Sequence, residues 1–164
     1  FDVVTPHEPR LKKLDGGVVL IEIESNRDPE EDRHFSEKWL PNTIGHIYEE
    51  VPEFIAEHQD ELRGRRVVAL THHHISSDWY PKGASTLGGL MEPAEGVDEF
   101  VEALDLVDER ALVLHGHRHD VMPVEYHYES HPVGNPGGFH LSSRLNIIDF
   151  DVYGDETITQ VQLR

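Results

Sequence analysis

The stretch Val67–His74 reads VVALTHHH, an aliphatic run that leads directly into three histidines. A second stretch, Ala111–His119, repeats this arrangement as ALVLHGHRH. Each aliphatic run is short, continuous and preceded by charged residues, which is typical of a strand covered on both faces. Both runs are too short for a buried helix. The sequence therefore predicts two buried strands of an α/β sheet, each ending in histidines.

One helix is expected before the first strand in the sequence, and another is expected after it. Residues 96–109 carry apolar side chains at helical spacing with acidic residues on the other faces, which predicts an amphipathic crossover helix. Another helix is predicted from about residue 52 to 62, with Pro52 at its first position and Gly64 as its C-terminal cap. The side chains of that helix expected to face the core are Phe54, Ile55 and Leu62. This alternation of helix and strand indicates an α/β fold.

The outer parts of the chain carry strand and turn signals. Residues 17–25 indicate a strand, and residues 124–128 alternate apolar and polar side chains. Residues 130–138, rich in Pro and Gly, are predicted to form a loop. Residues 145–152 and 157–163 are predicted to form a hairpin around Gly154 and Asp155.

The composition limits the possible partners. The chain has 32 Asp and Glu against 14 Lys and Arg, a net charge of −18, and no Lys follows Lys82. Such an acidic chain disfavours a long nucleic acid as partner. No apolar run could span a bilayer and no leader is visible, so a cytoplasmic location is expected. Because there is no Cys, disulfides and thiolate metal ligands are excluded.

The histidine clusters point to a metal site. Ligands of open α/β sheets bind beyond the carboxyl ends of the strands, and neutral imidazole is the commonest metal-binding side chain. If the two strands are neighbours, both clusters meet at one rim. Gly116 would let the backbone turn so that His117 and His119 serve two metal ions. A lone histidine is usually structural, which is the expectation for His7, His34, His46, His58, His131 and His140.

These paired strand–histidine motifs closely resemble those of the calcineurin-like metallophosphoesterases. In that family an apolar strand ends in one or two His, and a later strand is followed by Gly-His-X-His. Residues 16–25 and 145–151 also resemble strands of the family. The resemblance covers residues 1–164 but only the C-terminal part of the family domain. It implies that this chain is the C-terminal half of a layered α/β/β/α sandwich.

The resemblance assigns roles to individual histidines. His72 would be a metal ligand and would share its metal with His117, and His119 would bind the second metal. His73 would lie near the site, whereas His74 stands where the family often has Pro. His115, which precedes the motif, would support the site or pack behind it.

The family's Gly-Asn-His motif is absent from these 164 residues, and neither Asp32-Arg33-His34 nor Gly154-Asp155 is interpreted here as the family's amino-terminal Asp-X-His or Gly-Asp metal motif. The resemblance therefore implies that the bridging carboxylate and the assisting histidine lie in an amino-terminal half upstream of Phe1, and it assigns no catalytic residue here. In the complete enzyme two divalent metals, such as Mn, Fe or Zn, would hold a bridging hydroxide that attacks a phosphomonoester or phosphodiester. Three neutral histidines supply no negative charge, so the chain alone is expected to bind metal weakly and turn over little.

Three further side chains could contact a small phosphate-ester substrate. Trp79 and Tyr80 follow the first cluster and would either stack on a base or aromatic leaving group, or cap the core. Arg118 would either contact phosphate or remain solvated. Two alternative functions stay open, a noncatalytic scaffold of the same fold and a simple histidine-rich metal-binding protein.

Overall fold

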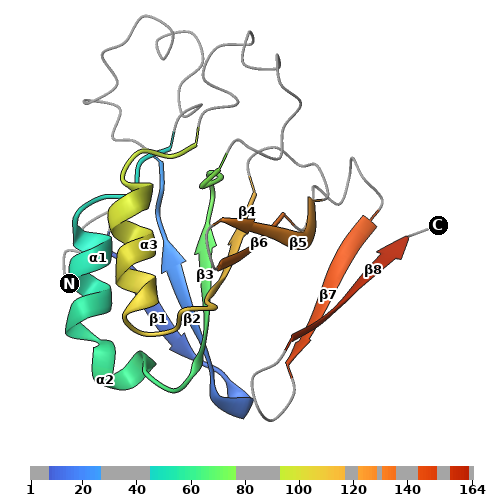
Figure 1. Ribbon diagram of the computed structural model, residues 1–164, viewed down its shortest axis with the longest axis horizontal. Coiled ribbons are helices and arrows are strands. Elements are labelled where there is room, and N and C mark those ends of the chain that lie inside the picture. The colour runs from blue at the N-terminus through green and yellow to red at the C-terminus, as the bar shows by residue number, and fades with distance from the viewer. Residues whose placement is uncertain are drawn as a thin grey trace, which may run out of the picture.

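The computed structural model describes residues 8–26, 45–76, 93–116, 122–128, 131–135, 144–150 and 156–162. Their main feature is a six-stranded sheet with the spatial order β1-β2-β3-β4-β6-β5 (Figure 1). Its strands are β1 (Arg10–Lys13), β2 (Val18–Ile23), β3 (Arg66–Thr71), β4 (Leu112–His115), β5 (Met122–Tyr128) and β6 (His131–Asn135). A short 3₁₀ turn, η1 (Asp15–Gly17), joins β1 to β2.

The centre of the sheet is parallel. Strands β2, β3, β4 and β6 run in one direction, and β1 and β5 pair antiparallel at the two edges. The two predicted aliphatic strands are β3 and β4, each displaced by one residue from its expected start, and they are direct neighbours. The α/β class predicted from the sequence is therefore confirmed.

Three helices lie among the described residues: α1 (Glu50–Glu57), α2 (Gln59–Leu62) and α3 (Val97–Asp105). The predicted crossover helix is confirmed as α3, which connects β3 to β4. The prediction of one helix over 52–62 is wrong, because the chain breaks at His58 and Pro52 is the third residue of α1. The backbone N–H of His58 donates to the Phe54 carbonyl at 3.1 Å, and His58 Nδ1 lies 2.9 Å from the same oxygen. These contacts are made where α1 ends. Gly64 does follow α2 in the left-handed conformation expected of a C-terminal cap, with φ 73°.

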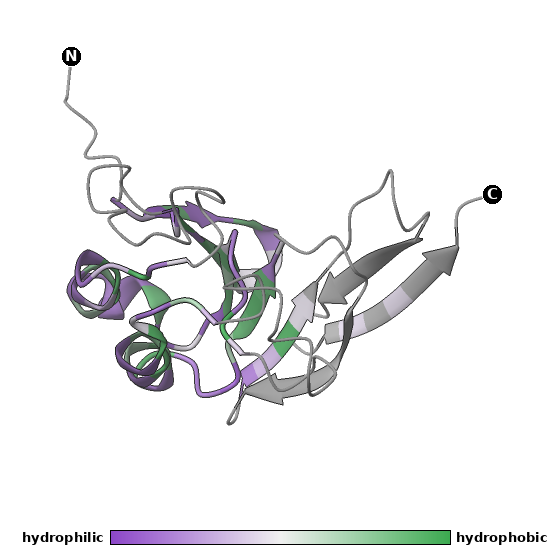
Figure 2. Cartoon of the chain, turned by 90° about the horizontal axis from the view of Figure 1, so that it is seen from above, coloured by the Kyte–Doolittle hydropathy of each residue, from purple (hydrophilic) through white to green (hydrophobic). Residues whose placement is uncertain are grey.

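The main core lies between one face of the sheet and helices α1 and α3, which cover that face side by side (Figures 1 and 2). Phe100 and Leu104 of α3 and Ile55 of α1 are fully buried there against Val19 and Ile21. Each such side chain contributes about 1.5–3 kcal/mol on burial. Of the helix residues predicted to face the core, Ile55 and Leu62 are buried and Phe54 is partly buried.

The opposite face of the sheet is also apolar. Strand alternation places Val18, Val68 and Leu112 on that face, where they are buried. Half-buried Leu20, Leu70 and Leu114 pack against them. The central strands are thus apolar on both faces, as their continuous aliphatic sequences predict.

The predicted loop over residues 130–138 is wrong for its first half, because residues 131–135 form β6. This strand inserts between β4 and β5 and pairs with both, through Val113↔Val133 on one side and His127↔Pro132 on the other. Pro and Gly weaken a strand locally, but here pairing on both sides and the burial of His131 and Val133 prevail. The Pro and Gly content of this segment therefore predicted a loop where the sheet forms a strand.

The C-terminal segment forms a separate two-stranded sheet, β7 (Arg144–Phe150) with β8 (Glu156–Gln162). These strands pair antiparallel from Arg144↔Gln162 to Phe150↔Glu156, which confirms the predicted hairpin. None of the helices in the described ranges has the length and apolar character needed to cross a membrane.

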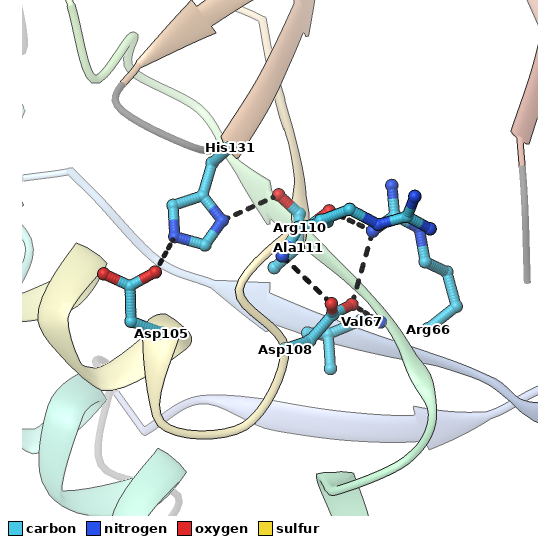
Figure 3. Close-up of polar contacts among 7 residues, drawn as sticks. All are labelled: Arg66, Val67, Asp105, Asp108, Arg110, Ala111 and His131. Carbon is cyan, nitrogen blue, oxygen red and sulfur yellow. Dashed lines mark hydrogen bonds and ion pairs between the residues drawn. The ribbon is translucent and has the colours of Figure 1, made fainter.

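Polar side chains tie the loop after α3 to the amino-terminal ends of β3 and β4 (Figure 3). Asp108 accepts hydrogen bonds from the backbone N–H groups of Val67 (2.9 Å) and Arg110 (3.1 Å). Its carboxylate also lies 3.4 Å from Arg66, whose side chain is 3% exposed and donates to the Arg110 carbonyl. We call Asp108 and Arg66 the basal pair. It fixes the end of the sheet opposite to the histidines.

Candidate functional site

The carboxyl ends of β3 and β4 bring the two histidine clusters together. In the parallel register Thr71 pairs with His115, so His72 and Gly116 leave the sheet next to one another. The Gly116 N–H donates to the His72 carbonyl at 3.0 Å, which continues the contact beyond the ladder. The prediction that the clusters share one rim is thus confirmed for the described part of each.

Hydrogen bonds hold the turn from His72 to His74 at every residue. The backbone N–H groups of His72 and His73 both donate to Ser25 Oγ, at 3.1 and 3.0 Å. The Thr71 hydroxyl donates to the His73 carbonyl at 2.7 Å, and the Ala94 N–H donates to the His74 carbonyl at 2.9 Å. With so many partners the backbone has little freedom, as a preorganised site requires.

The four described histidines of the rim differ in exposure. His72 is exposed, whereas His73, His74 and His115 are 1%, 0% and 3% exposed. The His74 and His115 rings lie with their centroids 6.0 Å apart, and the His73 ring meets the His72 ring edge-on at 4.8 Å. His72 therefore offers an accessible imidazole, with the buried His73 ring edge-on against it.

A second layer of backbone contacts closes the rim. The His46 N–H donates to the Ser25 carbonyl at 3.0 Å, and the Ile47 N–H donates to the Glu95 carbonyl at 2.8 Å. The Glu95 N–H in turn donates to the Gly45 carbonyl at 2.9 Å. We call these contacts, together with the one between Ala94 and His74, the bridging ladder. It joins four segments that are distant in sequence: Ser25, residues 45–47, His74 and residues 94–95.

Gly45 is required by its contact with His73. A Cβ at position 45 would overlap the Cβ and Cγ of the buried His73 side chain. A Cβ at Gly116 would instead meet the His72 carbonyl at 3.7 Å, an ordinary van der Waals distance. Close backbone approach thus demands glycine at position 45, which the sequence did not single out, and does not demand it at position 116.

Gly45→Ala is expected to lower the free energy of unfolding by about 1–3 kcal/mol, because the added methyl group overpacks His73. Gly116→Ala is the matched control, and its change should stay within about 0.5 kcal/mol. Urea denaturation of the two variants measures both effects. Equal stability of the two variants would contradict the assigned contact.

Several predicted site residues lie outside the described ranges: Trp79, Tyr80, His117, Arg118 and His119. Of the three predicted metal ligands, the structure thus places His72. Within the described ranges no three His, Cys, Asp or Glu side chains are grouped as a metal site. That observation covers only one of the predicted ligands.

Three of the histidines expected to be structural are described. His58 Nδ1 lies on the Phe54 carbonyl, and His46 lies 3.4 Å from the Glu95 carboxylate. His131 is fully buried, with Nδ1 3.1 Å from the Ala111 carbonyl and Nε2 3.1 Å from the Asp105 carboxylate (Figure 3). His58 and His131 thus have partners away from the rim, and the partner of His46 lies in the bridging ladder.

The described part of the rim offers one accessible imidazole, that of His72, which could serve as a metal ligand. Imidazole is a ligand that suits Zn and Fe. The ring of His73 has a hydrogen-bond partner in Ser25, so it is already engaged on one nitrogen. His72 is the one exposed side chain among the three histidines of this turn, so it is the most accessible to an ion. No family model matches the chain, and no curated protein matches it.

Proposed function

We propose that this chain forms part of a metal-dependent phosphoesterase of the calcineurin-like type, acting on a small phosphomonoester or phosphodiester. The observation that carries the proposal is the pairing of Thr71 with His115, which brings both histidine clusters to one rim of a parallel sheet. The carboxyl edge of such a sheet is where open α/β proteins bind their ligands.

In this proposal His72 and His117 hold one divalent ion, and His119 holds the other. The ions would supply Lewis acidity toward the phosphoryl oxygens and a lowered pKa of bound water. The residues of this chain would orient the ligands, with the buried His73 ring edge-on against His72. The carboxylate ligands of the family pattern would come from outside these 164 residues, in an amino-terminal half of the same domain.

We further propose the layered α/β/β/α sandwich as the complete architecture. The apolar face formed by Leu20, Leu70 and Leu114, opposite the helices, is of the kind that a second sheet covers. On this basis helices α1 and α3 form one outer layer.

The test uses the longest natural form of the protein that contains this chain. It is stripped with EDTA, reloaded with Mn²⁺ or Zn²⁺, and assayed on p-nitrophenyl phosphate and bis(p-nitrophenyl) phosphate. We expect turnover that disappears with EDTA and returns with metal, and the preferred probe separates monoesterase from diesterase activity. Folded protein that binds no metal and hydrolyses neither probe would contradict the proposal and favour the noncatalytic scaffold.

A further inference from the structure

We propose that Ser25 is a positioning residue for the histidine rim, one that orients His72 through the backbone and sets the tautomer of His73. This inference rests on the proposed function for its link to metal binding. Its geometric basis is independent of that function, because the contacts lie wholly among described residues.

Ser25 is 0% exposed and lies two residues beyond the end of β2. Its Oγ lies 3.1 and 3.0 Å from the backbone nitrogens of His72 and His73, and 3.1 Å from His73 Nδ1. One buried hydroxyl therefore contacts three nitrogens of the turn that carries the accessible histidine.

The donor and acceptor capacity of a hydroxyl decides the direction of each bond. A serine hydroxyl has two lone pairs and one proton. The two backbone N–H groups can only donate, so they occupy both lone pairs. The remaining contact must then be the hydroxyl proton donated to His73 Nδ1. Nδ1 is thus an acceptor, and His73 is neutral with its proton on Nε2.

The fixed tautomer and the fixed backbone act together on His72. The His73 ring is clamped between the Ser25 hydroxyl and the Gly45 backbone, and it meets the His72 ring edge-on. The hydrogen bond from the His72 N–H to Ser25 restrains the backbone from which the ligand side chain projects. Groups that orient a metal ligand in this way typically change metal affinity by about 10- to 100-fold when removed.

The first test is the ¹⁵N NMR spectrum of the imidazole rings, with His73 assigned by substitution. In the wild-type protein His73 should show an unprotonated, hydrogen-bonded Nδ1 and a protonated Nε2. Ser25→Ala should move the His73 nitrogens toward a mixture of tautomers. A wild-type His73 with its proton on Nδ1 would overturn the inference even if no variant folds.

Thr71→Val is the matched control. It removes a hydroxyl that donates to the His73 carbonyl, in the same turn, and leaves the contact between Ser25 and the His73 ring in place. A purely structural role of Ser25 predicts the same spectrum for both variants. The inference predicts that Thr71→Val keeps the wild-type tautomer and Ser25→Ala does not.

The second test is Zn²⁺ affinity, measured by calorimetry on the longest natural form of the protein that contains this chain. Ser25→Ala should weaken binding about 10- to 100-fold. If wild-type protein binds Zn²⁺ through His72 and Ser25→Ala binds equally well, the inference fails while the proposed function stands. If His72→Ala leaves Zn²⁺ binding unchanged, the proposed function fails, and the nitrogen spectra still decide the role of Ser25.

Discussion

Asp108→Ala is expected to lower the free energy of unfolding by about 3–5 kcal/mol, because it removes the Asp108 carboxylate from beside the buried Arg66 charge. The side chains of Arg66 and Asp108 are 3% and 15% exposed, so water replaces little of the lost contact. The substitution also removes the hydrogen-bond acceptor of the Val67 N–H, near the start of β3. Urea denaturation followed by circular dichroism measures the change.

Two further variants make this expectation specific. Glu102→Ala, which removes an exposed acid from α3, should change stability by less than about 0.5 kcal/mol. Arg66→Met combined with Asp108→Ala should recover part of the loss, because no charge is then left uncompensated. A loss from Asp108→Ala no larger than that from Glu102→Ala would mean that the basal pair does not stabilise the fold.

His72→Ala should reduce metal-dependent hydrolysis by more than about 100-fold, if the rim is the proposed phosphoesterase site. Removing an outer partner of a metal ligand costs about 10- to 100-fold, and removing the ligand itself should cost more. The measurement is kcat/KM for the p-nitrophenyl ester that the wild-type protein prefers, together with the bound metal per protein. Both quantities should fall together.

His46→Ala is the control for this prediction. His46 joins the bridging ladder through its backbone, which the substitution keeps, and its partly exposed ring lies against Tyr48 and Glu95. We expect its hydrolysis rate to stay within about threefold of wild type, which is a change in activation free energy of less than about 0.7 kcal/mol. Unchanged hydrolysis and metal content in His72→Ala would exclude His72 as a ligand.

The strands and the crossover helix were predictable because their signals are periodic and local. The continuous apolar runs of β3 and β4 and the helical spacing in α3 survive in the structure almost residue for residue. Strand β6 was not predictable in this way, because Pro132 and Gly134 oppose a strand and only the flanking strands stabilise one. The break at His58 depends on a side-chain contact with Phe54, which no periodicity reveals.

The histidine clusters of the site were predictable from the sequence, but the residues that hold them in place were not. The two histidine clusters follow buried strands, and that placement alone brings them to one rim. Ser25 acts on a turn 47 residues away, and Gly45 is needed because of one buried ring. Neither has a local signal, since a serine after a strand and a glycine before a helix are ordinary features of many loops.

The bridging ladder has a consequence for how such a protein can diversify. It joins Ser25 to His46 and His74 to Ala94 by backbone hydrogen bonds of 3.0 and 2.9 Å, so the residues that flank segments 27–44 and 77–92 are held together. Doubling the length of a loop with fixed ends costs only about 0.6 kcal/mol. Insertions and deletions within either segment can therefore accumulate while the turn that carries His72 stays in place. Such a scaffold could change what it recognises without rebuilding its histidine rim.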